Sequence, residues 1–164
     1  MITKKGGFTL IELLIVIALL GVLAVGLLAT IDPFEQLKKG RDTSTRNMVE
    51  EFYNGALRYY SIKDEFPWGT ESVASVALSA AAMSDTYLQT IVDSGELKQA
   101  FLDASGLGEV LVTSTTGDDL TVCFQPQSKA FRNDNNSKYD ATGGTLGTDV
   151  CPNPTSSLCH WCIR

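Results

Sequence analysis

A single acidic side chain, Glu12, interrupts an otherwise uncharged apolar stretch near the start of the sequence. The stretch covers residues 8–31 and contains no Lys, Arg or His. An isolated carboxylate near one end of a membrane helix costs on the order of 2–3 kcal/mol to insert, so it requires a partner. Glu12 is therefore the first residue whose chemistry needs an explanation.

A new α-amino group is the cation most readily made available to Glu12. Cutting the chain just before Phe8 would create such an amine, and a helix that starts at Phe8 would place it one turn from Glu12. In a staggered stack of helices, the same amine would instead face Glu12 of a neighbouring copy. The sequence thus predicts proteolytic processing followed by side-by-side assembly.

The apolar stretch is also long enough to cross a bilayer as a helix. About two dozen residues at about 1.5 Å per residue exceed a hydrocarbon core of about 30 Å. Asp32-Pro33 follows it, and Pro33 removes a helical hydrogen bond and kinks or breaks the helix. This break is either a simple helix end at the membrane surface or a flexible point within a packed filament.

The basic leader and the apolar stretch together form a specific motif. Lys4-Lys5-Gly6-Gly7, followed by Phe8-Thr9-Leu10-Ile11-Glu12, resembles the class III signal of type IV pilins and type II secretion pseudopilins. The resemblance is strong over residues 4–68 and only architectural beyond them. It implies that a membrane-embedded aspartyl peptidase cuts between Gly7 and Phe8 and that Phe8 is then N-methylated. It also implies that Glu12 is the charge partner between subunits.

Two simpler readings of the same stretch remain. A secretory signal peptide normally has a shorter apolar core that ends in a small-x-small cleavage site, and here the stretch is longer. A one-pass membrane anchor would need Glu12 to reach the interface by snorkelling.

The cysteines lie close together at the other end of the chain. Their even number, their clustering and the predicted export favour disulfides, although three pairings are possible. A zinc site is the alternative, but His160 lies between two candidate ligands and the spacing is not that of paired CxxC knuckles. A redox role for Cys159-x-x-Cys162 lacks a thioredoxin-like context. The candidate disulfide residues are Cys123, Cys151, Cys159 and Cys162.

The polar tail offers two further candidate sites. Asp134, Asn136 and Asp140, together with Asp149, supply oxygen ligands for calcium, but their order does not match an EF-hand loop, so a solvated acidic loop is the simpler reading. Trp68 and Trp161 are either exposed stacking platforms or core residues, and a Trp beside a disulfide usually covers it.

Composition argues against two broad functions. The net charge is −6, and loss of Lys4 and Lys5 with the leader would make it −8. An acidic chain without a Lys/Arg stripe gives no support for direct nucleic-acid binding. The chain has one His, no nucleophile elbow and no Gly-rich phosphate loop. We therefore predict a non-enzymatic protein without a cofactor.

A long helix should position the N-terminal motif relative to a head. Residues 34–46 are polar without an apolar face, which predicts a stalk. From Met48 onward, apolar side chains recur at helical spacing and predict packing on a sheet. Pro67 should end this helix by biasing Phe66 out of the helical region. The apolar positions of this packing face are Val49, Phe52, Ala56 and Tyr59 or Tyr60.

The remainder predicts a small antiparallel sheet of about three to four strands. Residues 69–106 read as a connecting region with a short helix capped by Ser84-Asp85 and stopped by Gly95, a further helical turn within 96–102, and a loop or weak helix at 75–83. Residues 110–113 and 120–124 flank a hairpin turn, and residues 128–132 are a candidate third strand. From Asn133 the tail should be irregular and stapled by its cysteines. The fold class is α+β and pilin-like, with residues 1–7 as leader, 8–33 as assembly helix and 34–164 as stalk and head.

The resemblance implies a structural, major pilin-like subunit of a type IV pilus or related extracellular filament. Its partners would be prepilin peptidase, the assembly platform, minor pilins and copies of itself. The precursor would reside in the cytoplasmic membrane and the product in a cell-surface filament. Because family members at a filament tip often lack the acidic residue, Glu12 favours a shaft subunit. The alternatives are a major pseudopilin of a secretion or competence system and a membrane-anchored binding or adhesion module that uses Trp161 and the acidic loop.

Overall fold

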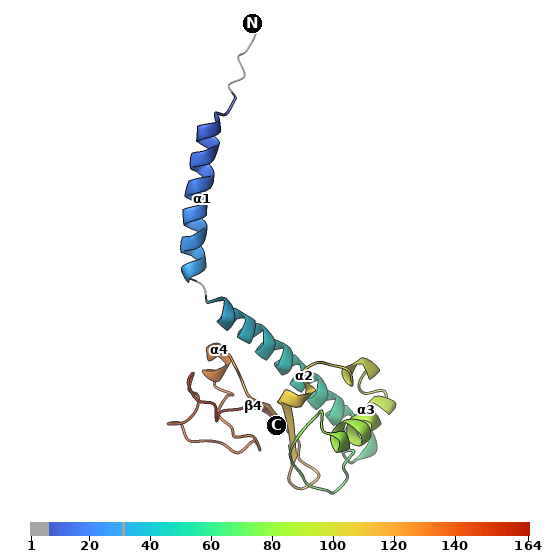
Figure 1. The fold of residues 1–164 in the computed structure, drawn as a ribbon. Helices are drawn as coiled ribbons and strands as arrows, with labels where there is room; N and C mark the ends of the chain where they lie inside the picture. Colours follow the sequence, from blue (N-terminus) through green and yellow to red (C-terminus); the bar gives the residue numbers. More distant parts are fainter. Residues whose placement is uncertain (1–6, 31) are drawn as a thin grey trace. The chain divides into compact units, whose positions relative to one another are not determined.

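A computed structural model describes residues 7–30 and 32–164, which form two units divided between Phe34 and Glu35. The helices are α1 (Leu10–Thr30), α2 (Pro33–Lys63), α3 (Gln89–Asp93) and α4 (Lys129–Arg132), with a π-helical stretch η1 (Met83–Leu88) and 3₁₀ turns η2 (Gln99–Phe101) and η3 (Leu107–Glu109). The strands are β1 (Val73–Ala77), β2 (Val110–Ser114), β3 (Thr121–Phe124) and β4 (Trp161–Ile163). Figure 1 labels most of these elements along the chain.

The first unit consists of α1 and the start of α2. Residues 10–28 of α1 are all exposed, so this part of the helix buries its apolar surface against none of the described residues of its unit. The helix ends at Thr30 and α2 begins at Pro33, which confirms the break expected at Asp32-Pro33. Pro33 is the first residue of α2, where its missing N–H would have no helical partner. The Asp32 carboxylate accepts a hydrogen bond from the Phe34 N–H at 3.1 Å and so caps the new helix.

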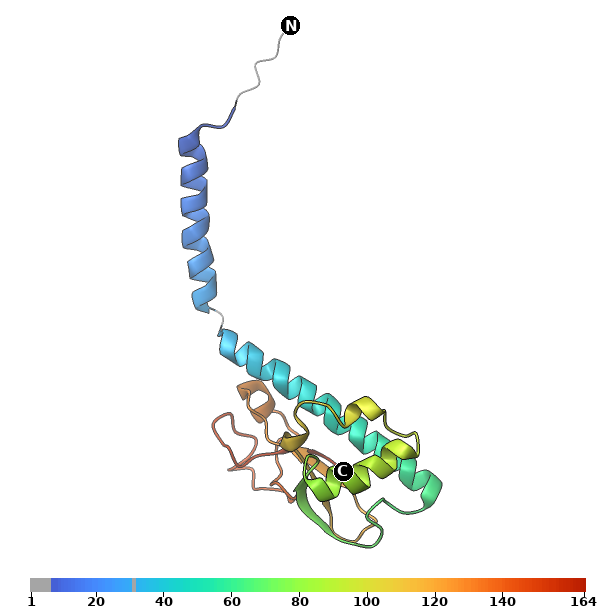
Figure 2. The same cartoon turned by 45° about the vertical axis from the view of Figure 1, so that its right-hand side comes forward.

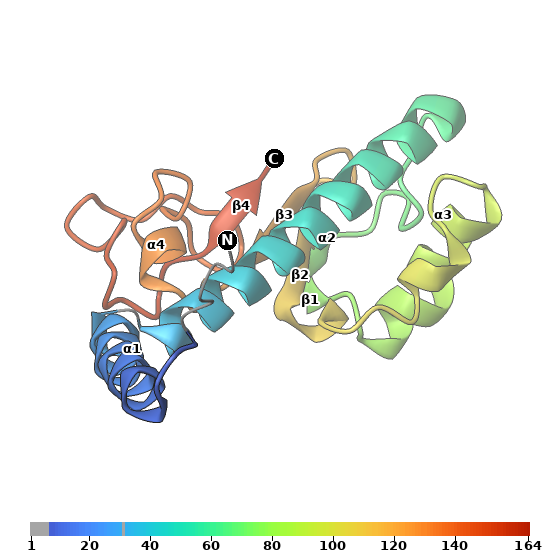
Figure 3. The same ribbon diagram turned by 90° about the horizontal axis from the view of Figure 1, so that it is seen from above.

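The second unit is built on the rest of α2, which crosses one face of a sheet (Figure 3). Val49, Phe52 and Ala56 are completely buried, as their helical spacing predicted. They belong to one core cluster with Val112 and Val122 of the sheet. The helix ends at Lys63, ahead of Phe66-Pro67, which confirms the predicted end.

The described residues form one antiparallel sheet in the order β1-β2-β3-β4. The predicted hairpin is present, because β2 pairs with β3 through Val110 opposite Phe124 and Thr113 opposite Thr121. Gly117 lies in the connecting turn with a φ of 81°, which a side chain would disfavour. The protein therefore has the pilin-like α+β fold: an N-terminal helical region with an apolar first half, a small sheet and C-terminal disulfides.

The predicted third strand at residues 128–132 is wrong. Lys129–Arg132 is the short helix α4, and the Ser128 hydroxyl caps it by accepting from the Phe131 N–H at 3.3 Å. A Ser followed by helix formers is a normal helix start, and this local signal decides the structure here. The outer strands of the sheet are β1 and β4 instead.

Strand β1 lies in the region expected to be only a connection. It has a register irregularity between Val73 and Val76, and Ser75 has a φ of 49°. This bulge interrupts the alternation of apolar and polar residues that identifies strands in a sequence. The loop or weak helix predicted from Ser75 is therefore partly wrong.

The short helices of the connecting region are present with a different start. The helical stretch runs from Met83 through α3 to Asp93, preceded by Ala82 without a side-chain cap, so the predicted Ser84-Asp85 cap is wrong. Gly95 follows with a φ of 84°, which confirms the predicted stop. The helical turn expected within residues 96–102 is η2.

Contacts at both ends of α2 fix the second unit. Near its C-terminal end, Arg58 donates to the Glu96 carboxylate at 2.8 Å, and Gly55 allows the Leu97 side chain to approach α2 closely. Figure 2 shows α3 beside this half of α2 and α4 beside its N-terminal part. Residues from Glu35 belong to the same unit as the head, and Asp42 and Thr45 are buried there, so the second half of the segment predicted as a polar stalk packs on the head.

Candidate processing and assembly site

The residues around the predicted cut have no regular secondary structure. Gly7, Phe8 and Thr9 precede α1, which begins at Leu10. The Phe8 side chain is 88% exposed. In the uncut chain α1 therefore begins at Leu10, two residues after Phe8, where the sequence predicts the helix of the processed chain to start.

Thr9 and Glu12 form a reciprocal cap on α1. The Thr9 N–H and the Thr9 hydroxyl donate to Glu12 Oε2 at 2.7 and 2.8 Å, and the Glu12 N–H donates to the Thr9 hydroxyl at 3.3 Å. This is a capping box, which satisfies N–H groups that otherwise lack partners at a helix start. The Thr-x-x-Glu spacing could have revealed it from the sequence.

The capping box leaves half of the Glu12 carboxylate open. Both donors bind Oε2, and Oε1 has no hydrogen bond to the residues that the structure describes. Glu12 therefore has a partner in its own chain but can still accept from a further donor. Glu12 lies in α1, whose segment Leu10–Leu28 is long and apolar enough to cross a membrane by length and composition.

Residues 2–28, which include this site, match the family model of the prokaryotic N-terminal methylation motif. The chain begins with the motif typical of type IV pilins and pseudopilins. No curated protein and no solved structure matches the chain. The methylation motif marks structural, non-enzymatic subunits, and it implies processing by prepilin peptidase followed by polymerisation. With the apolar helix, it suggests a location in the membrane and then at the surface.

A second carboxylate, Asp42, organises the start of the head and was missed in the sequence. It is 2% exposed and accepts from the Gln127 N–H at 2.9 Å, the Ser128 N–H at 2.8 Å and the Ser128 hydroxyl at 2.5 Å. Three donors compensate for the burial of its charge. Asp42 thereby ties α2 to the segment that leads into α4.

Glu35 makes a similar contact with the next residue of the chain, Lys129, which is the first residue of α4. Its carboxylate accepts from the Lys129 N–H at 3.0 Å and from the Lys38 ammonium at 3.1 Å. These donors lower the pKa of Glu35, the Lys129 N–H most strongly. Asp42 and Glu35 of α2 thus accept from three successive backbone N–H groups, those of Gln127 and Ser128 just before α4 and that of Lys129 at its first residue.

The four cysteines form two nested disulfides, Cys123–Cys162 and Cys151–Cys159. The first joins neighbouring strands β3 and β4, as expected for a tail stapled to the strand of Cys123. The zinc alternative is wrong for these cysteines, because their sulfurs are bonded to each other. Among the described residues, no group of three His, Cys, Asp or Glu side chains is arranged to hold a metal ion.

The smaller disulfide ring should contribute measurably to stability. Replacing both Cys151 and Cys159 with Ala is expected to lower the free energy of unfolding by about 2.5 kcal/mol, because the bond restricts a short loop of the unfolded chain. Guanidinium unfolding of the full chain, with Cys123–Cys162 kept oxidised, would measure the loss. An unchanged unfolding midpoint would contradict this assignment.

The tryptophans are core residues. Trp68 is 3% and Trp161 is 5% exposed, so neither is an exposed stacking platform. Trp68 stacks on Phe66 with ring centroids 4.9 Å apart, and the Arg46 guanidinium lies 5.3 Å from the Trp161 ring. The binding module that would use Trp161 as its contact residue is therefore wrong in that respect.

The candidate calcium ligands make local turns. Asp134 accepts from the Asn136 N–H at 2.8 Å, and Asp140 accepts from the Thr142 N–H and the Gly144 N–H at 2.8 and 2.9 Å. The Thr142 hydroxyl and these N–H groups lower the pKa of Asp140. Asp149 is exposed. These contacts are those of a hydrogen-bonded polar loop and give the calcium reading no support.

A further carboxylate holds the hairpin turn between β2 and β3. Asp119 accepts from the N–H groups of Thr115 and Thr116 at 2.8 and 2.9 Å and from both hydroxyls. Burial alone would raise the pKa of Asp119, but the donors of Thr116 and Thr115 together outweigh it and lower the pKa to about 2.

This shift predicts an acid dependence of stability. Because the folded pKa lies below the unfolded one, Asp119 stabilises the head above about pH 4, and this contribution is lost as the pH falls toward 2. Asp119→Asn should cost about 1–2 kcal/mol at neutral pH, allowing for partial exposure, and little at pH 2. Urea unfolding of both proteins between these pH values would show converging midpoints. Parallel curves would contradict the role of Asp119.

Proposed function

We propose that the chain is a major pilin-like structural subunit of a type IV pilus or related extracellular filament. The observation that carries this proposal is the methylation motif with Glu12 placed in the first turn of α1 and one carboxylate oxygen open. An open acceptor at the start of an exposed apolar helix is what a charged donor from a neighbouring subunit would need.

Processing is the first step of the proposal. Prepilin peptidase cuts between Gly7 and Phe8, and Phe8 is then N-methylated. The irregular backbone at residues 7–9 supports this placement, because a bond outside a helix can enter a peptidase without unfolding α1.

Assembly follows from the new amine. The N-terminus of Phe8 donates to Glu12 of a neighbouring copy, and this pairing sets the axial register of the filament. The exposed apolar surface of α1 exchanges lipid for neighbouring α1 helices. The break before Pro33 gives the chain a point at which a filament can bend.

Two measurements on native material test this proposal together. Mass spectrometry of the N-terminus should find methylated Phe at position 8, and negative-stain imaging of sheared surface material should find thin filaments that contain the chain. A mature protein that retains residues 1–7 would contradict the proposed cut, and processed protein that never enters filaments would contradict the structural role.

A major pseudopilin of a secretion or competence system is the second candidate. The observation in its favour is the compact connection between α2 and β2, which holds one short strand and a few helical turns. The presence of Glu12 favours a shaft position in either filament. Filament length distinguishes a pilus subunit from a pseudopilin, because a pseudopilin filament would not extend beyond the cell surface at native expression.

A further inference from the structure

The charges of the head are unevenly distributed along the chain. Residues 33–47 and 127–133 together contain six Lys or Arg and two acidic residues. The rest of the head, residues 48–126 and 134–164, contains five Lys or Arg and fifteen acidic residues. Two short segments of an otherwise acidic head therefore carry a surplus of positive charge.

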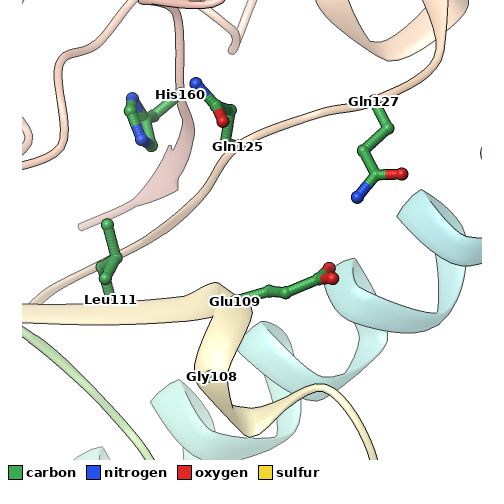
Figure 4. A pocket seen from close by; sticks show the side chains of 6 residues that line it. All are labelled: Gly108, Glu109, Leu111, Gln125, Gln127 and His160. Carbon is green, nitrogen blue, oxygen red and sulfur yellow. The ribbon is translucent and has the colours of Figure 1, made fainter.

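These two segments lie side by side in the structure. Gln127, just before α4, lies beside α2 in Figure 4, and its N–H donates to the Asp42 carboxylate at 2.9 Å. Lys39 of α2 and Ala130 of α4 line the same hollow. The basic residues of the two segments thus form one surface, which we call the basic collar: Lys38, Lys39 and Arg41 of α2 with Lys129 and Arg132 of α4.

The two acidic residues at this end of the head are already engaged. Asp42 is buried among its three hydrogen-bond donors, and Glu35 pairs with the Lys38 ammonium at 3.1 Å. Outside the collar, Arg46 pairs with Glu50. Three exposed basic residues form no ion pair with any residue that the structure describes: Lys39, Arg41 and Lys129.

Two apolar side chains beside the collar are uncovered. Phe34 is 72% exposed and Leu37 is 65% exposed. Together with Arg41 they are spaced by three and four residues, which places all three along one side of α2. A helix segment that combines exposed apolar groups with Lys and Arg is typical of a membrane–water interface, where the apolar groups enter the headgroup boundary and the basic groups meet lipid phosphates.

The chain keeps the collar within reach of a bilayer that contains α1. The segment Leu10–Leu28 is about 28 Å long as a helix, close to the ~30 Å of a hydrocarbon core. From Thr30 to Pro33 the chain spans at most about 11 Å, and the helix from Pro33 to Lys39 adds about 9 Å. Lys39 therefore lies within about 20 Å of the end of α1 in any arrangement of the two units.

We propose that the basic collar, with Phe34 and Leu37, docks the head onto the anionic lipid headgroups of the membrane that holds α1. This inference rests on the membrane stage of the proposed function and adds a lipid contact made by the head itself. Each Lys or Arg near an anionic lipid surface increases the attraction, and the tether through α1 keeps the headgroups at a high effective concentration. The same surface repels the acidic remainder of the head, so the collar is the part that meets lipid.

Lysine acetylation of the full chain in lipid nanodiscs tests the docking. The discs contain phosphatidylcholine alone or with about one third phosphatidylglycerol, and mass spectrometry measures labelling by a water-soluble N-hydroxysuccinimide ester. We expect Lys39 and Lys129 to be labelled about threefold more slowly in the anionic discs, and about 1 M NaCl should abolish the difference by screening. The exposed amines of Lys63 and Lys98 should be labelled equally in both discs.

Arg41→Glu tests the collar without changing either reporter lysine. Because Arg41 is exposed and forms no ion pair with the described residues, the variant should fold normally and lose at least half of the protection of Lys39 and Lys129. Lys98→Glu makes the same change of charge beside the C-terminal half of α2 and is the matched control, which should be protected as wild type is.

The outcomes separate the docking from the function on which it rests. Equal labelling of Lys39 and Lys129 in both discs would show that anionic headgroups do not cover the collar, and the docking would be wrong. The same conclusion would follow if Lys98→Glu reduced the protection as much as Arg41→Glu. A chain that did not co-elute with either disc would contradict the membrane stage itself, whereas an inserted chain without protection would contradict the docking alone.

Discussion

Replacing Glu12 with Gln is expected to reduce the amount of this chain in sheared filaments about tenfold or more, while N-terminal processing continues. A hydrogen bond to a charged partner contributes about 1.5–3 kcal/mol, and each 1.4 kcal/mol changes an equilibrium tenfold. In a filament the loss recurs at every subunit contact. Immunoblots of sheared and cell-associated fractions would measure it.

Gln is the informative substitution because it separates the two contacts of Glu12. A Gln at this position still accepts from the Thr9 N–H and hydroxyl, so the capping box survives. Only the negative charge is removed. Processing should persist because the capping box leaves the backbone at Gly7–Phe8 outside the helix.

A matched control comes from the same chain. Glu51→Gln removes one negative charge from an exposed position of α2 and should leave filament yield unchanged. If Glu12→Gln assembled as well as this control, the proposed pairing of Glu12 with the Phe8 amine would be wrong. If both variants failed, net charge rather than a specific pair would govern assembly.

The sequence predicted those parts of the fold whose signals are local. The helix break at Pro33, the apolar face through Val49, Phe52 and Ala56, and the hairpin between β2 and β3 each follow from a spacing or a turn residue. The Thr9–Glu12 capping box has such a local signal too, in the Thr-x-x-Glu spacing at the start of α1.

The missed parts depend on contacts between residues far apart in the chain. Strand β4 pairs with β3 beside the Cys123–Cys162 disulfide, and the sequence allowed three cysteine pairings without choosing this one. Strand β1 contains a bulge near Ser75, which interrupts the alternation of apolar and polar residues that would have identified it. The polar surface of residues 34–46 suggested solvent on all sides. Its carboxylate at Asp42 is buried because the segment that follows β3 places the N–H groups of Gln127 and Ser128 against it.

Asp42→Ala is expected to lower the free energy of unfolding of the head by about 3–5 kcal/mol. The substitution removes three hydrogen bonds and leaves the N–H groups of Gln127 and Ser128 without their acceptor. Each bond to a charged group contributes about 1.5–3 kcal/mol, and relaxation of the segment recovers part of that. The loss should appear in guanidinium unfolding of the full chain with both disulfides intact. Asp103→Ala, at an exposed carboxylate without a described contact, should stay within about 0.5 kcal/mol of wild type.

A double-mutant cycle with Ser128→Ala separates this contact from general damage to α2. Ser128→Ala alone removes the hydroxyl bond to Asp42 and the cap on the Phe131 N–H, so we expect a cost of about 1–2 kcal/mol. The double variant should be more stable than the sum of the single losses predicts, by about 1 kcal/mol or more, because the shared hydrogen bond is lost only once. Additive losses would mean that Asp42 and Ser128 act independently. In that case the buried carboxylate would not be what holds the start of α2 to α4.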